Sequence, residues 1–302
     1  RYWRDWSSDV CSSDLAVGFV VTLQRRSRRA GLIAVAVMGG LAFVSTLAAS
    51  STAVAALWMG AVGLAYGLGA LRGWHTLTQQ LAIWCAYITV NPLQAGAATK
   101  LSRIDQVQPD LRAALVTAAV IVVTGAAMAV LAGFAKGTPR PLEPLTRDSA
   151  RLLGIAMAVL LGVGTAIVLG GDRHPAGEWL LLTMIVVSRP DVHGTYRHTL
   201  ERVVGTIAGV LVAGVIGLGL GDAPVRSLLA LALLVVAFAF MQVPGRYWMY
   251  VLFLTPGIVL IESPPEATAA LAADRLVYTL VGAAAVTAAA LAVSALNRRR
   301  SV

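Results

Sequence analysis

The chain alternates between long uncharged segments and short segments that carry its charged residues. Residues 30–71 contain no Asp, Glu, Lys or Arg, which is enough for two membrane-spanning helices separated by the polar residues 50–52. Six further uncharged runs are each long enough for one span: 73–99, 113–135, 152–171, 203–221, 227–245 and 276–297. Two shorter runs, 179–188 and 247–261, are predicted as spans with polar ends because they keep the alternation across the membrane.

These runs predict about ten transmembrane helices, at 32–48, 52–71, 77–97, 112–134, 152–170, 177–189, 203–220, 226–243, 246–262 and 273–296. The predicted fold class is therefore an all-α polytopic integral membrane protein. The composition agrees, because 58% of the residues are hydrophobic and only 13% are charged, about half the share usual in a soluble domain. These values exclude a disordered chain and argue against a soluble globular enzyme.

The first fifteen residues differ in character from the rest of the chain, because they are polar and rich in Ser and Asp. Residues 5–15, DWSSDVCSSDL, resemble the in-frame translation of a common sequencing-library adapter. We therefore expect residues 1–15 to be an artefactual tail and the apolar residues 16–23 to end a truncated span, so that N-terminal helices are missing. Cys85 is then the single genuine cysteine, and we expect it to pack as a small apolar residue.

The basic residues fit one topology when the C-terminal Arg298–Arg300 is placed in the cytoplasm. Alternating backwards from there puts sixteen of the 24 Lys and Arg residues in inside loops and six in outside loops, with the other two in the tail. Because cytoplasmic loops are enriched in Lys and Arg, this split predicts a multi-pass protein of the bacterial inner membrane with a cytoplasmic C-terminus. The topology also explains the net charge of +9, so no binding to nucleic acid is expected.

One Pro-rich segment of mixed charge, KGTPRPLEPLTRDSAR, divides the hydrophobic runs into two halves near residue 145. The predicted parts are the tail 1–15, an incomplete N-terminal transmembrane half 16–134, a cytoplasmic linker 135–150, a C-terminal six-helix transmembrane module 151–296 and a cytoplasmic basic tail 297–302.

The segment 179–209 carries the most informative residues. A short apolar run led by Trp ends at Arg-Pro-Asp, a polar elbow with Thr and Arg comes next, and Arg-x-x-Gly-Thr-x-x-Gly opens the next helix. The residues of this pattern are Trp179, Arg189, Pro190, Asp191, Thr195, Arg197, Arg202, Gly205, Thr206 and Gly209. They resemble the membrane module of the fusaric acid resistance-like (FUSC) family of aromatic acid exporters, over residues 149–296, with a weaker likeness over 30–134.

The resemblance implies a transporter that exports organic anions, typically aromatic carboxylic acids, driven by proton motive force. Arg189, Arg197 and Arg202 would then attract the carboxylate from the cytoplasmic side. Asp191 and Glu201 would hold those arginines or carry protons. Plant anion channels of related fold work as dimers, so a passive anion channel and a homodimer are alternatives. A membrane scaffold or envelope-stress protein that moves no solute is the alternative from a different class.

A later helix echoes the first motif. The pattern Glu-Arg-x3-Thr-x2-Gly at 201–209 matches Asp-Arg-x3-Thr-x2-Gly at 274–282. Arg275 therefore joins the candidate substrate-binding residues, and Asp274 joins the candidate ion-pair or proton-coupling residues. An arginine at a helix start opposes the helix dipole, so it needs an acidic partner, an anionic substrate or a lipid headgroup to which it extends.

Small residues recur every four positions at Gly205, Gly209, Ala213 and Gly217. They lie on one face of the predicted 203–220 helix and predict a close approach by a neighbouring helix. Ordinary membrane packing is the favoured interpretation of the glycines themselves.

Two features mark the predicted 246–262 helix. Tyr247, Trp248 and Tyr250 at its start are typical of an interfacial aromatic belt, with stacking of an aromatic substrate as the alternative. Residues 255–257, Thr-Pro-Gly, interrupt the helix near its middle. Such a break predicts a kink where the helix packs on protein or lines a cavity.

Catalytic and metal-binding patterns find no support. His193 and His198 share the elbow, but their spacing suits one helix face poorly, so a solvated loop is expected in place of a metal site. The chain has no P-loop, no nucleophile elbow and no cysteine pair. We therefore expect no enzyme activity, no cofactor and no metal, and the predicted partners are a small organic anion and the lipid bilayer.

Overall fold

A computed structural model describes residues 28–91, 111–132, 144–171, 177–189, 192–219, 223–241, 246–263 and 265–300. Within these residues every regular element is helical. The α-helices are α3 (Arg28–Ala48), α4 (Thr52–Ala70), α5 (His75–Val90), α6 (Leu111–Ala132), α7 (Arg147–Gly170), α8 (Glu178–Val187), α9 (Val192–Gly219), α10 (Ala223–Met241), α11 (Tyr247–Glu262) and α12 (Thr268–Arg300), with a 3-10 turn η1 (Pro265–Ala267) before the last. Each predicted helix overlaps one of these ten, so the all-helical prediction is confirmed.

The helices differ in their capacity to cross a membrane. In the described part of the chain, α4, α7, α9 and α12 are long and apolar enough to do so, by length and composition. The ten residues of α8 rise only about 15 Å, roughly half the thickness of the hydrocarbon core. The length of α8 alone therefore does not support its prediction as a complete span.

The largest difference from the predicted helices is at the start of α9. The sequence predicted a polar elbow and a helix from residue 203, but α9 already begins at Val192. Its first turns bury Thr195, Thr199, Arg202 and Thr206, which recur at the three- and four-residue spacing of one helix face. Because this buried stripe is polar, a search for apolar periodicity misses it.

Contacts divide the described residues into two compact units. Residues up to Val186 form one, the N unit, and residues from Val187 form the other, the C unit. This grouping differs from the sequence-based boundary near residue 145, because α7 packs along α4 and so belongs to the N unit.

Glycines bring α4 and α7 together in the N unit. A Cβ atom on Gly67 would overlap the backbone of Gly154, and one on Gly63 would lie 2.5 Å from the carbonyl carbon of Met157. The two helix backbones therefore touch, which is the close packing that small residues permit between membrane helices.

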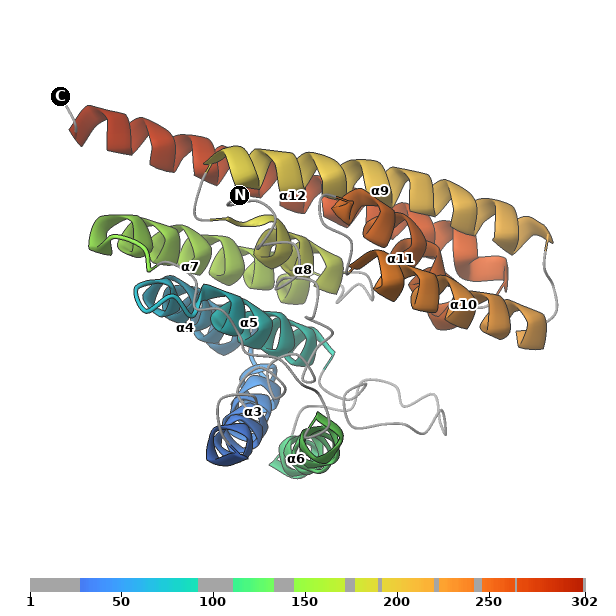
Figure 1. Cartoon of the computed structure of the whole chain (residues 1–302), viewed down its shortest axis with the longest axis horizontal. Coiled ribbons are helices and arrows are strands. Elements are labelled where there is room, and N and C mark those ends of the chain that lie inside the picture. Colours follow the sequence, from blue (N-terminus) through green and yellow to red (C-terminus); the bar gives the residue numbers. More distant parts are fainter. Residues whose placement is uncertain are drawn as a thin grey trace. The chain divides into compact units, whose positions relative to one another are not determined.

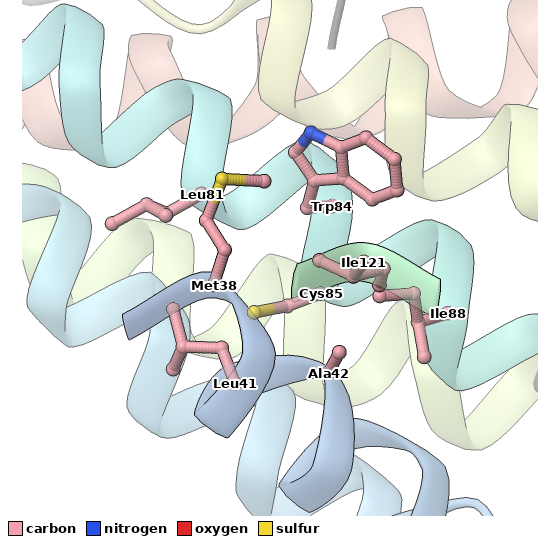
Figure 2. A pocket seen from close by; sticks show the side chains of 8 residues that line it. All are labelled: Met38, Leu41, Ala42, Leu81, Trp84, Cys85, Ile88 and Ile121. Carbon is pink, nitrogen blue, oxygen red and sulfur yellow. The ribbon is translucent and has the colours of Figure 1, made fainter. Parts of the chain in front are cut away.

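Three other helices of the N unit, α3, α5 and α6, share an apolar cluster. Figure 2 shows a small pocket there, lined by Met38, Leu41, Ala42, Leu81, Trp84, Cys85, Ile88 and Ile121. Cys85 is buried and forms no disulfide, which confirms its predicted role as a small apolar residue. A lining this apolar offers no charged group to an anion.

Among the four long helices of the C unit, α9 packs against both α11 and α12, and α10 packs against its neighbour α11 (Figure 1). Gly209 lies against Thr255 of α11, and Gly217 lies against Thr268 at the start of α12. The end of α9 thus meets the beginning of α12, so these two helices run antiparallel (Figure 1).

We expect Gly67→Ala and Gly40→Ala to change stability in opposite directions. The added methyl at Gly67 would collide with the backbone of Gly154, whereas a methyl at Gly40 meets no atom within 4 Å. Overpacking costs about 1–3 kcal/mol, while Gly→Ala in an open helix gains about 0.5–1 kcal/mol. Thermal unfolding of the two purified variants in detergent measures this difference, and equal melting temperatures would contradict the close α4–α7 contact.

Candidate functional site

The buried stripe of α9 carries a charge as well as hydroxyl groups. Arg202 is 4% exposed and lies between Thr199 and Thr206, which are also buried. The hydroxyl of Thr199 donates to the carbonyl oxygen of Thr195 at 2.7 Å, one helical turn earlier. A buried guanidinium in such surroundings is costly unless acceptors or an anion compensate it.

Thr195 fixes the chain just before α9. The backbone N–H of Arg189 donates to the Thr195 hydroxyl oxygen at 3.0 Å, and that hydroxyl donates to the carbonyl oxygen of Arg189 at 3.1 Å. Arg189 is thereby held as a buried residue beside the first turn of α9. Asp191, which the sequence also assigned to this site, lies outside the described residues.

Arg202 contacts an aromatic group at the start of α11. Its Nη1 lies 3.4 Å from the hydroxyl oxygen of Tyr247, and its Nε has no hydrogen-bond partner among the described residues. The Tyr247 ring stacks on the imidazole of His198, with centroids 4.6 Å apart and planes inclined by 16°, and it lies at a tilt beside the ring of Tyr250. Tyr247 is therefore a buried residue of this site, packed between α9 and α11 instead of exposed on the helix surface.

The two histidines near this site lie in a helix and not in the loop that the sequence predicted. Both His193 and His198 belong to α9, so the prediction of a solvated loop is wrong. His193 is exposed, whereas His198 is half-buried against Tyr247. Arg189 and Arg197 lie close enough to His198 to interact with it electrostatically.

Glu201 holds one arginine of this group. Its carboxylate oxygen accepts a hydrogen bond from Arg197 Nε at 2.9 Å, one helical turn earlier on α9. The Arg197 side chain is 52% exposed, so this surface ion pair contributes little to stability. Glu201 thus pairs with Arg197, and among the described residues no carboxylate forms an ion pair with Arg202.

Arg275 occupies the corresponding place on α12. It is 1% exposed, and the half-buried Asp274 precedes it. Glu262, at the end of α11, interacts electrostatically with Arg275. The echo of the sequence thus corresponds to two buried arginines on two packed helices, α9 and α12.

The glycines of α9 face two different helices. A Cβ atom on Gly205 would lie 2.6 Å from the Trp248 carbonyl oxygen of α11, and one on Gly209 would lie 2.7 Å from Thr255 Cβ. A Cβ atom on Gly217 would instead lie 2.9 Å from the methyl group of Thr268. The first two glycines therefore bring α11 close to α9, and the third brings α12 close.

Sequence reasoning missed Arg226, which it placed among the outside-loop arginines. This α10 residue is 3% exposed and donates to the carbonyl oxygens of Leu260 at 3.2 Å and Ser263 at 2.6 Å. It also donates to the hydroxyls of Ser263 at 3.1 Å and Thr268 at 2.6 Å. Arg226 thus joins the end of α11 to the start of α12, and no motif in the sequence indicated this.

Comparison with known proteins supports the motif-based resemblance. Residues 164–289 match the family described as fusaric acid resistance protein-like, and this region holds the arginines of α9 and α12. An uncharacterized protein of Synechocystis sp. is 31% identical over 144 residues, which are 47% of this chain and 18% of that protein. The chain thus spans less than a fifth of that relative. No solved structure matches the chain.

We expect Arg226→Met to destabilise the C unit by about 3 kcal/mol or more. The substitution keeps a side chain of similar volume but leaves the carbonyls of Leu260 and Ser263 and the hydroxyls of Ser263 and Thr268 without their charged donor. Hydrogen bonds to a charged group contribute about 1.5–3 kcal/mol each. Arg246→Met removes an exposed arginine and serves as the control. Equal unfolding temperatures of the two variants would contradict the bridging role of Arg226.

Proposed function

We propose that the fusaric acid resistance-like region at residues 164–289 makes this chain part of a membrane transporter that exports organic anions. Aromatic carboxylic acids are the proposed substrates, and the proton motive force is the proposed energy source. The family match supports efflux as the activity. The substrate class and its coupling to protons rest on the resemblance and on the residues around Arg202.

The observation that carries the proposal is the buried charge of Arg202. Within the described residues, no carboxylate lies within ion-pair distance of its guanidinium, and Glu201 pairs with Arg197. A buried cation left without an acid attracts an anion strongly, because little water competes for it. A carboxylate has acceptor oxygens only, so it complements the N–H donors of Arg202.

Neighbouring groups fit the same chemistry. Arg189 and Arg197 add positive charge near His198, which favours an anion approaching from this end of α9. The rings of Tyr247 and Tyr250 lie beside this charge and offer apolar surface to an aromatic acid. In this proposal, Asp191, Glu201 and Asp274 are the groups that pair with the arginines or carry protons.

We expect Arg202→Ala to abolish export of aromatic acids while the protein still inserts into the membrane. Cells carrying the wild-type gene should accumulate at least tenfold less radiolabelled benzoate than cells carrying the variant, roughly the effect of one lost charge-assisted hydrogen bond. Arg202→Lys keeps the charge and should recover part of the activity. Arg246→Ala, which removes an exposed arginine, should export like the wild type.

A protonophore separates the modes of transport. It should stop export against a gradient if protons drive the process. A benzoate conductance that persists without a proton gradient would identify a passive channel. Equal accumulation for the wild type, Arg202→Ala and an empty vector, with both proteins present in the membrane, would refute transport and favour a scaffold.

We also propose that the chain lies in the bacterial inner membrane with its C-terminus in the cytoplasm, as a homodimer. For orientation, Ser301→Cys and Ala223→Cys, each made in a background without Cys11 and Cys85, place thiols on opposite sides. A membrane-impermeant maleimide applied to intact spheroplasts should label Ala223→Cys and spare Ser301→Cys. The reverse labelling pattern would contradict the proposed orientation.

A further inference from the structure

The echoed motifs of α9 and α12 occupy one packed interface. At one level of this interface, Gly217 of α9 contacts Thr268 of α12. One turn away, Ala213 of α9 and Ala272 of α12 belong to the same buried cluster. These two contacts fix which residues of α9 and α12 lie opposite each other. The helices are antiparallel, so moving four residues toward the start of α9 corresponds to moving four residues toward the end of α12.

Extending this register brings the two echoed threonines opposite each other. Seven more residues along each helix lead from Ala213 to Thr206 and from Ala272 to Thr279. Seven residues are close to two full turns, so the same helix faces meet again. Thr206 and Thr279 are 1% and 0% exposed, as expected for side chains inside this interface.

The register gives the pair a local two-fold symmetry. Each threonine follows its motif arginine by four residues, and the helices run in opposite directions. Arg202 therefore lies about 6 Å along the helix axis on one side of the Thr206–Thr279 level, and Arg275 lies about 6 Å on the other side. Both arginines are buried, and long helical side chains lean toward the start of their own helix, so the two guanidinium groups flank the central level on its outer sides.

The threonine hydroxyls near the Thr206–Thr279 level differ from the other threonine hydroxyls of the C unit in their hydrogen bonding. Thr199 and Thr287 donate to the carbonyl oxygen one turn earlier, as threonines in membrane helices commonly do. In the described structure, the hydroxyls of Thr206, Thr255 and Thr279 have no hydrogen-bond partner although they are fully buried. Thr255 lies against Gly209, one turn from Thr206 on the same side of α9.

We propose that Thr206 and Thr279 form the central anion-binding site of the exporter, with Thr255 as a third donor and with Arg202 and Arg275 as the cations on its two sides. This inference rests on the proposed function. Buried hydroxyls without acceptors are costly, and a carboxylate supplies acceptors without needing donors. The anion passes from one arginine to the paired hydroxyls and on to the other arginine, over about 12 Å of helix length.

Substitutions that change only the hydroxyl test this site. Thr206→Val and Thr279→Val keep the shape and remove the donor, whereas Thr206→Ser and Thr279→Ser keep it. The expected result is a rise of about tenfold in the Km for radiolabelled benzoate in proteoliposomes for each valine variant, equal for the two because of the two-fold symmetry. The serine variants and the control Thr287→Val should stay close to the wild type.

Thermal unfolding with and without benzoate adds a readout that does not need transport. Benzoate should raise the unfolding temperature of the wild type and of the control Thr287→Val. This rise should be lost in Thr206→Val and in Thr279→Val. If the hydroxyls only pack, the valine variants should be at least as stable as the wild type, with unchanged Km and an unchanged benzoate shift. That result would overturn the central site.

The outcomes also separate this inference from the proposed function. Transport that Arg202→Ala abolishes but that the valine variants leave intact would refute the central site and keep the exporter. A wild-type protein that neither transports benzoate nor is stabilised by it would refute both.

Discussion

A buried guanidinium in a membrane protein has no bulk water with which to share its charge, and this constraint shapes the C unit. The guanidinium of Arg226 finds acceptors inside the protein: its Nε and Nη2 donate to four oxygens at the end of α11 and the start of α12, while its Nη1 has no partner among the described residues. Two of these oxygens are the carbonyls of Leu260, in the last turn of α11, and of Ser263, its C-cap, at the end where the helix dipole is negative. Arg202 has only the Tyr247 hydroxyl at 3.4 Å, so its compensation must come from outside the described chain.

Close packing of α9 against α11 is what buries Arg202 with so few acceptors around it. Gly205 and Gly209 let α11 approach the backbone of α9, and this approach buries the polar stripe that would otherwise face lipid. It also places Tyr247 of α11 next to Arg202 and His198 of α9. A larger residue at either glycine would separate the two helices and remove the aromatic partner from the buried arginine. The packing residues and the charged residues therefore act together.

The sequence predicted the helices well, because uncharged runs of the required length need only composition to be recognised. It predicted a close approach to α9 from glycines at a spacing of four. It did not predict that Gly217 faces α12 while Gly205 and Gly209 face α11, because each step of four residues turns slightly further around the helix. It failed at the start of α9, where the buried side chains are Thr and Arg and give no apolar period. It also failed for Arg226, because counting charges by loop ignores which carbonyls a side chain reaches after the helices pack. Sequence alone does not say which arginine Glu201 contacts, and the geometry identifies Arg197.

The two ends of the C-unit helices carry matching motifs but are held with different strength. Near the start of α12, separating α10 from the end of α11 and from Thr268 breaks the four hydrogen bonds of Arg226. Toward the start of α9, separating α11 from α9 breaks one long hydrogen bond and the stacking of Tyr247 on His198. Hydrogen bonds to a charged group are among the stronger ones, so opening costs less at the α9 start. A central site with equal donors on both sides would then fill and empty more readily through the end where Arg189, Arg197 and Arg202 gather.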